Sequence, residues 1–152
     1  MRQSIAAVAV IRRRDSGRTL WLAQWNRNWQ CYSFVGGHKR STESFRECVV
    51  REVGEELGLA EGSEFRILSV PIAHVEYTAW SGSAEQETEY TMELFDVQLV
   101  SNSACQKIDA DPRNRWLSEA ELRGQRCGDG RPVSETIASL LVKAKLLGPN
   151  GL

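Results

Sequence analysis

The sequence predicts an α/β fold in which helices pack on a mixed β-sheet. Segments rich in small and β-branched apolar residues recur between glycine-containing turns, which is typical of strands joined in hairpins. Two amphipathic segments have the period of a helix, one in the first half of the chain and one near its end. The chain has 152 residues, the size of one domain, and we expect residues 1–152 to form a single domain.

Composition excludes several classes of protein. Hydrophobic residues make up 41% of the chain and charged residues 26%, which is ordinary for a globular protein. No apolar segment approaches the roughly 20 residues that cross a bilayer, so we expect no membrane partner. The apolar stretch near residue 1 is short and lacks a small-residue cleavage site before the arginines, so we expect no signal peptide and a cytoplasmic location.

Residue types that bind soft metals are few. Four cysteines lie far apart without a Cys-x-x-Cys pair, so neither a zinc site nor a disulfide framework is predicted; they are Cys31, Cys48, Cys105 and Cys127. His38 and His74 are the only histidines, which leaves little material for a histidine-based metal site. We therefore expect any bound metal to be held by oxygen atoms.

The N-terminal region predicts a hairpin and a short third strand. Residues 4–13 form a strand, residues 15–18 a turn, residues 19–25 the partner strand and residues 30–35 a further strand. Residues 1–40 carry eight Lys and Arg residues and one acidic residue, whereas the whole chain has a net charge of −1. This asymmetry suits an anionic ligand held between basic groups and an acidic, cation-loaded site, although scattered surface charges would give the same sums.

A helix is predicted to begin between Ser41 and Ser44, with Ser41 or Thr42 as its N-cap, and to end at Gly58. Its apolar stripe consists of Phe45, Val49, Val53 and Leu57. Three acidic residues fall within an arc of about 100° beside this stripe: Glu52, Glu55 and Glu56. The stripe is expected to dock the helix, with the acids at its edge.

These three glutamates crowd like charges on one part of the helix. Like charges at i, i+3 and i+4 destabilise a helix by roughly a few tenths of a kcal/mol per pair, and Glu55 and Glu56 also lie near the unfavourable C-terminal end of the dipole. A bound Mg²⁺ would compensate, because it takes oxygen ligands and is commonly held by carboxylates. Arg51 is placed to pair with one of the carboxylates. The alternative is a solvated glutamate-rich face, which is common on helices.

The second half of the chain predicts more strands and two helical segments. Residues 65–80 and 87–100 form two long strands around the turn at residues 81–86, with a bend or edge position at Pro71. Residues 114–124 predict a short strand and a helical turn, in which Ser118 and Glu121 have capping-box spacing. Residues 133–148 predict an amphipathic closing helix.

A longer pattern runs from Gly37 to Leu59. Five residues follow Gly37 before Glu43, seven more precede Arg51, and the segment ends as Arg-Glu-Val-Gly-Glu-Glu-Leu-Gly-Leu. This resembles the Nudix box, G-x5-E-x7-R-E-U-x-E-E-x-G-U with U a bulky apolar residue, and it matches at every defined position. Such a match would arise by chance in a chain of this size on the order of once in ten million. The chain therefore resembles the Nudix hydrolase family.

The resemblance implies an α/β/α sandwich with a central mixed sheet and hydrolysis of a nucleoside diphosphate linked to another group. It implies Mg²⁺ as cofactor, with Mn²⁺ possible, and a small nucleotide as partner. Metal ligands would be Glu52, Glu55, Glu56 and the carbonyl of Gly37. Catalytic roles fall to Glu52, Glu55 and Arg51, and orienting roles to Glu43 and Arg51. Either Glu52 or Glu55 is the candidate general base.

Some members of the family use a glutamate outside the box as the base. Here Glu87, Glu89 and Glu93 lie on the predicted strand after residue 86, and the simpler explanation of each is an exposed strand or loop acid. The substrate-binding residues are not identified. The loop that enters the helix departs from the usual pattern at Val35, Tyr32, Arg40 and Thr42, and its basic run His38, Lys39 and Arg40 either contacts phosphate or faces solvent.

Two tryptophans flank a predicted loop near the box, Trp25 and Trp29. Stacking of a nucleobase on either would contribute about 1–3 kcal/mol, but tryptophan is more often a core or rim residue. Two other functions stay open: a catalytically silent Nudix-like nucleotide-binding module, and processing of an RNA cap or other nucleic acid. A pI of about 6.2 argues against nucleic acid as a partner. A homodimer is compatible with the sequence.

Overall fold

The computed structural model describes residues 1–149, so the last three residues of the predicted domain, 150–152, lie outside the described residues. The strands are β1 (Arg2–Val10), β2 (Arg12–Asp15), β3 (Arg18–Asn26), β4 (Cys31–Ser33), β5 (Gly36–His38), β6 (Phe65–Ile67), β7 (Ala73–Ser81), β8 (Gln86–Leu99) and β9 (Asn114–Leu117). The helices are α1 (Phe45–Leu57), α2 (Asn102–Ala110), α3 (Glu119–Gly124) and α4 (Glu135–Lys143).

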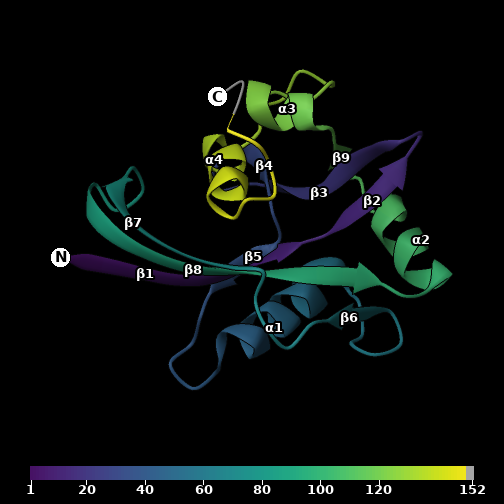
Figure 1. Cartoon of the computed structure of the whole chain (residues 1–152), viewed down its shortest axis with the longest axis horizontal. Helices are drawn as coiled ribbons and strands as arrows, with labels where there is room; N and C mark the ends of the chain where they lie inside the picture. Colours follow the sequence, from purple (N-terminus) through teal and green to yellow (C-terminus); the bar gives the residue numbers. More distant parts are fainter. Residues whose placement is uncertain (150–152) are drawn as a thin grey trace.

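Two sheets form the centre of the fold. The larger has the order β5-β1-β8-β6, and β7 also pairs with β8. Strands β1 and β8 are parallel while the other pairs are antiparallel, so this sheet is mixed. The smaller sheet is built on β3, which pairs with β2, β4 and β9. Helix α1 lies on one side of the larger sheet and α3 and α4 on the other, which confirms the predicted α/β/α sandwich (Figure 1).

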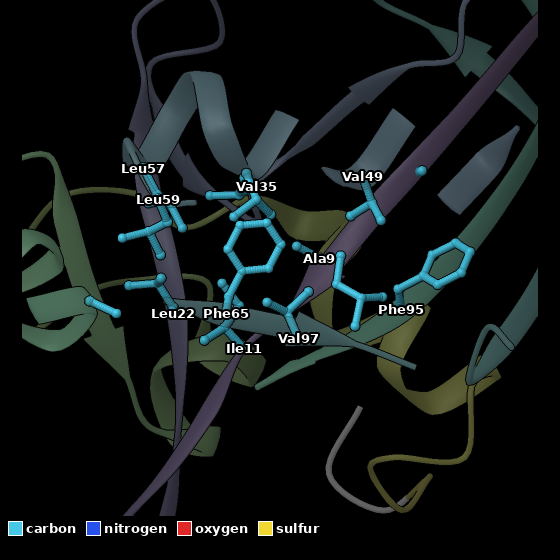
Figure 2. Close-up of a cluster of buried hydrophobic side chains, with 14 of the residues drawn as sticks. Ala9, Ile11, Leu22, Val35, Val49, Leu57, Leu59, Phe65, Phe95 and Val97 are labelled. Atoms are coloured by element: carbon cyan, nitrogen blue, oxygen red, sulfur yellow. The ribbon is translucent and has the colours of Figure 1, made fainter. Parts of the chain in front are cut away.

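The alternation of side chains along β1 explains the two layers of core. Ala7 and Ala9 point into a cluster under α1, whereas Val10 belongs to a second cluster under α3 and α4. Figure 2 shows the first cluster, which includes Val49 of α1 and Phe95 of β8. Because β1 is covered on both faces, its sequence reads as a nearly continuous apolar run.

The predicted first strand is divided between the two sheets. Strand β1 ends at Val10 and pairs with β8, whereas β2 begins at Arg12 and pairs with β3. The predicted hairpin turn is confirmed between β2 and β3, where Ser16 and Gly17 have φ angles of 51° and 82°. Two consecutive positive φ angles fit a two-residue hairpin whose twist matches its strands.

Residues 65–80 form two strands rather than the single strand predicted. Strands β6 and β7 pair with different parts of β8, at residues 97–99 and 86–94, and the segment between them contains Pro71. The bend predicted at Pro71 is confirmed. This arrangement is possible because β8 is long enough to pair with both β6 and β7.

The N-cap of α1 is Ser44, so the prediction of Ser41 or Thr42 as the cap is wrong. Ser44 Oγ accepts from the backbone N–H of Glu47, and the Glu47 carboxylate accepts from the N–H of Ser44, which closes a capping box. Ser44 alone among the three candidates has a glutamate three residues later. The predicted C-terminal stop is confirmed at Gly58, which has a left-handed φ of 68°.

Helix α2 was not predicted from the sequence. Its buried side chains are Ala104 and Ile108, too few to give a clear periodic signal. The capping box at Ser118 is confirmed at the start of α3, and the closing helix α4 ends at Lys143, earlier than predicted. None of the helices formed by residues 1–149 is long and apolar enough to cross a membrane.

Candidate active site

The carboxylate of Glu52 is seated on the backbone of Gly37. Glu52 lies on the buried side of α1 and is 9% exposed. A Cβ atom at Gly37 would lie 2.5 Å from Glu52 Oε1 and 2.7 Å from its Cδ. Only glycine at residue 37 therefore leaves room for this carboxylate against β5. The box glycine and the box glutamate, fifteen residues apart in sequence, form one structural unit.

Arg51 and Glu43 form a two-pronged ion pair at the start of the site. Arg51 Nη2 donates to Glu43 Oε1 at 2.7 Å, and Arg51 Nε donates to Oε2 at 3.1 Å. The backbone N–H of Arg40 also donates to Glu43, at 2.9 Å. These hydrogen bonds, with that of Arg51 the largest cause, lower the pKa of Glu43 to about 2. Arg51 is thus fixed by a carboxylate that stays ionised.

The same guanidinium group reaches two of the predicted metal ligands. Arg51 Nη1 donates to Glu52 Oε1 at 2.8 Å and lies 3.4 Å from Glu55 Oε2. Burial raises the pKa of Glu52, Arg51 opposes that rise, and the charges of Glu55 and Glu56 add to it. Glu43, Arg51, Glu52 and Glu55 are therefore brought together, as the resemblance implied.

Glu55 and Glu56 occupy the last turn of α1, where the helix dipole disfavours negative charge. Helix α1 has no basic residue in that turn. Cations from outside the helix face its end instead: Arg113 Nη2 lies 3.4 Å from the carbonyl oxygen of Glu56, and Lys107 Nζ lies 3.3 Å from that of Gly58. Residues from outside α1 therefore provide the positive charge that its own last turn lacks.

The donor set suits a hard divalent cation. Within residues 1–149, no three acidic, histidine or cysteine side chains converge into a ready-made metal site. The Glu55 side chain is 52% exposed, Glu56 is half-buried, and Glu52 is held on Gly37. The carbonyl oxygen of Gly37 accepts from Cys48 Sγ at 3.5 Å. The carboxylates of Glu52, Glu55 and Glu56 and the carbonyl group of Gly37 are all oxygen donors, which is the type of ligand that such a cation prefers.

Comparison with known proteins identifies the family of this arrangement. The model of the NUDIX domain matches residues 3–137. The chain belongs to the Nudix family. The Nudix hydrolase family acts on phosphoric anhydride bonds of nucleoside diphosphate derivatives, and its enzymes generally use divalent metal ions. Comparison of the sequence with curated proteins gives no significant match.

Solved structures share the Nudix fold at low sequence identity. An Ap4A hydrolase from C. elegans has a TM-score of 0.63 at 17% identity, over 96% of this chain and 98% of that one. A mutT/nudix family protein from Listeria innocua has a TM-score of 0.64 at 14% identity, over 96% and 94%. The NUDIX domain of Shewanella oneidensis NrtR, solved with ADP ribose, has a TM-score of 0.63 at 15% identity, over 96% and 88%.

Among the glutamates outside the Nudix box, Glu93 lies nearest in register to the site. Gly37, Ala7 and Glu93 are neighbours across β5, β1 and β8, and Ala7 faces the cluster under α1. Glu93 therefore projects toward the face that carries Glu52. His74 Nδ1 lies 2.8 Å from Glu93 Oε2. Two further acids of β8, Glu87 and Glu89, are exposed and lie beyond this row.

The basic loop before α1 divides into different roles. His38 Nε2 lies 3.2 Å from Ser4 Oγ, and the ammonium group of Lys39 lies 5.8 Å from the centre of the Phe45 ring. Arg40 is exposed. Of the three basic side chains in this Nudix loop, Arg40 is the one directed to solvent without a side-chain partner among residues 1–149.

The two tryptophans near the box differ in environment. Trp25 is half-buried, with its ring edge-on to Tyr32 at 5.2 Å and the guanidinium of Arg131 4.9 Å from its centre. Trp29 is 60% exposed. Trp25 is therefore part of the packing, and Trp29 is the tryptophan available to an external ring.

Sequence reasoning missed the residues that surround the end of the Nudix helix. They come from β3, α2, the segment before β9 and the start of β9, and they are Gln24, Lys107, Arg113 and Asn114. They carry no spacing signal, because Gln24, Lys107 and Arg113 reach the helix end from segments that are distant in sequence, and Asn114 joins it only through Gln24. The only local hint is Gln24, a glutamine inside the otherwise apolar run of residues 20–25 in β3.

Proposed function

We propose that this chain is a divalent-metal-dependent hydrolase that cleaves the diphosphate bond of a nucleoside diphosphate linked to another group. The observation that carries the proposal is the carboxylate of Glu52, seated on Gly37 and fixed by Arg51. This arrangement sets one oxygen donor at the sheet, while Glu55 and Glu56 stand at the surface beside it. We further propose residues 1–152 as a single cytoplasmic domain.

Mg²⁺, or Mn²⁺ in its place, would be held by Glu52, Glu55 and Glu56, with the carbonyl oxygen of Gly37 as a neutral donor. When bound, such a cation neutralises phosphoryl oxygens and lowers the pKa of water. The chain supplies a proton acceptor, for which Glu52 and Glu55 are the two candidates. Burial raises the pKa of the Glu52 carboxyl group, which favours the uptake of a proton there. Arg51 and Glu43 orient these carboxylates.

The proposed substrate class agrees with the ligands named for two similar structures. Ap4A and ADP ribose both contain adenosine phosphate joined through a phosphoric anhydride bond. A small nucleotide of this kind needs no extended surface. Arg40 lies in the loop of the Nudix box and Trp29 in the segment between β3 and β4; both are exposed, and we propose them as contacts for phosphate and base.

A substrate panel tests the proposal. Sugar nucleotides, dinucleotide cofactors, nucleoside triphosphates and diadenosine polyphosphates are incubated with the protein in Mg²⁺ or Mn²⁺, and products are identified by mass spectrometry. We expect metal-dependent release of a nucleoside monophosphate or a related phosphate. Glu56→Gln should abolish it, while Glu119→Gln, an exposed acid on α3, should not. Full activity in Glu56→Gln would contradict the proposal.

A second candidate is a nucleotide-binding regulator that does not turn its ligand over. It is favoured by similarity to the NUDIX domain of NrtR, which was solved with ADP ribose. This function predicts a higher Tm with ADP-ribose and no product from the whole panel.

A third candidate, processing of an RNA cap or other nucleic acid, needs a continuous basic surface. The arginines of β2 are partly neutralised, since Arg12 pairs with Asp96 at 3.0 Å and Arg13 lies 3.9 Å from Asp109. We therefore propose a small molecule rather than nucleic acid or membrane as the partner, with a homodimer as a compatible state. RNA binding that weakens steeply from low to moderate salt would argue for the third candidate.

A further inference from the structure

A network of two side-chain amides, buried at Gln24 and half-buried at Asn114, joins the last turn of α1 to three other elements. Gln24 of β3 is 7% exposed, and its Nε2 donates to the carbonyl oxygen of Glu56 and to Oδ1 of Asn114, each at 3.0 Å. Asn114, the first residue of β9, donates from Nδ2 to the carbonyl oxygen of Ile108 in α2, also at 3.0 Å. The chain of bonds therefore runs from the Nudix helix through β3 and β9 to α2.

Each amide in this network has one orientation that satisfies its partners. Both hydrogens of the Gln24 amide are used, because its two partners are both acceptors. Asn114 must present oxygen to Gln24 and nitrogen to Ile108, since the reverse would set donor against donor. A buried network of this kind specifies one arrangement, because any shift leaves a polar group unpaired.

The carbonyl oxygen of Glu56 is the point at which the network meets the helix. It belongs to the last turn, whose carbonyl groups lack partners within the helix. Gln24 approaches it from β3, and Arg113 approaches it from the segment before β9. A hydrogen bond to the backbone of Glu56 fixes the rotation of the turn from which the Glu55 and Glu56 side chains project.

We propose that Gln24 and Asn114 are positioning residues that set where the carboxylates of Glu55 and Glu56 stand relative to Glu52. The inference rests on the proposed function, in which these carboxylates hold a divalent cation. Neither amide touches the carboxylate groups in this arrangement, since the bond to Glu56 is made to its backbone. Their effect on metal binding is therefore indirect, through the rotation and translation of one helical turn.

Binding of Mn²⁺ tests this, measured by the electron paramagnetic resonance signal of the free ion. Gln24→Met keeps the length of the side chain and removes both hydrogen bonds. We expect its Kd for Mn²⁺ to rise about 10-fold, the size found when groups that orient metal ligands are lost. Asn114→Leu should weaken binding similarly, and the double variant should be no weaker than the worse single variant, because both break one network.

The matched control is Ser118→Ala. It removes the N-cap of α3, on the opposite side of the sheet, and so destabilises the fold without touching α1. Its Tm should fall while its Kd for Mn²⁺ stays that of the wild type. Should Gln24→Met fail to fold, Asn114→Leu serves instead, with the same expected rise in the Kd for Mn²⁺, because it removes the acceptor for Gln24 and the donor to Ile108.

The outcomes separate this inference from the function on which it rests. Wild-type affinity for Mn²⁺ in Gln24→Met, or an equal loss in Ser118→Ala, would overturn the positioning role and leave the metal site intact. A wild-type protein that binds no Mn²⁺ would overturn the proposed metal site, and the positioning role with it. Weak binding of Mn²⁺ in Gln24→Met together with wild-type binding in Ser118→Ala supports both the positioning role and the proposed metal site.

Discussion

The carboxylate of Glu52 lies so close to Gly37 that a methyl group there would sit 2.5 Å from Glu52 Oε1. The neighbouring glycine is constrained differently, because a Cβ at Gly36 would overlap the backbone carbonyl of Ala7. Gly37 therefore leaves space for the Glu52 side chain, whereas Gly36 leaves space for the backbone of the neighbouring strand at Ala7. Substitutions at these two adjacent positions should therefore separate effects on the proposed metal site from effects on the stability of the fold.

Gly37→Ala should weaken Mn²⁺ binding at least 10-fold with a small change in Tm. The methyl group displaces the end of a flexible side chain, which can turn away, but it removes the seat that orients Glu52. Gly36→Ala should instead lower the free energy of unfolding by about 1–3 kcal/mol, because backbone must shift. Electron paramagnetic resonance and thermal denaturation of both variants check this, and equal Mn²⁺ affinity in Gly37→Ala and wild type would contradict it.

The ion pair of Glu43 with Arg51 should give a pH-dependent contribution to stability. The pKa of Glu43 falls from 4.5 to about 2, so the contribution is fully present above pH 4.5 and is lost as the pH falls through about 2. Glu43→Gln should therefore be less stable than wild type at pH 7, and the difference should shrink at pH 3. Urea denaturation at the two pH values measures it. A difference that is the same at both values would exclude this ion pair as its source.

Gly54→Ala should stabilise the protein. Gly54 lies inside α1, where glycine costs about 0.5–1 kcal/mol relative to alanine, and the added Cβ would lie 3.7 Å from the carbonyl oxygen of Leu59, an ordinary contact. Gly58→Ala should have the opposite sign, since its φ of 68° is left-handed and costs about 1–2 kcal/mol for alanine. Denaturant unfolding compares the pair, and a loss of stability in Gly54→Ala would show that the helix interior has less room than its geometry indicates.

Replacement of the two tryptophans should separate packing from ligand contact. Trp25→Ala should lower the free energy of unfolding by about 2 kcal/mol, because the half-buried ring contacts Tyr32 and Arg131. Trp29→Ala should stay within about 0.5 kcal/mol of wild type. A stacking role therefore appears as a raised KM in Trp29→Ala at unchanged stability, worth about 1–3 kcal/mol. An unchanged KM in that variant would remove Trp29 from the substrate site.

Local patterns identified the elements that depend on neighbours in the chain. The capping box at Ser118, the left-handed stop at Gly58 and the turn between β2 and β3 are all decided within about four residues, so their signals survive in the sequence. Helix α2 has no such local signal, because it buries only Ala104 and Ile108. Its position depends on contacts with β9 and with residues 58–64.

The point at which the predicted first strand divides between two sheets also has no signal in the local sequence. Nothing between residues 4 and 13 marks Ile11 as the point where the chain leaves one sheet for another, since both halves read as extended backbone. Pairing with β8 on one side and with β3 on the other decides it. The register that places Glu93 beside Ala7 and Gly37 arises in the same way.

By itself, the sequence determined the family, the acidic face of α1 and the pairing of residue types that a phosphoric anhydride hydrolase needs, because these depend on identities at fixed spacing along one helix and its entry loop. The tertiary structure alone decided that Glu52 rests on Gly37, that Arg51 reaches three acids, and that Gln24, Lys107 and Arg113 close the end of the helix. The contacts at the helix end join residues up to 57 positions apart, and only the tertiary fold brings β3, α2 and the segment before β9 within hydrogen-bonding distance of the end of α1.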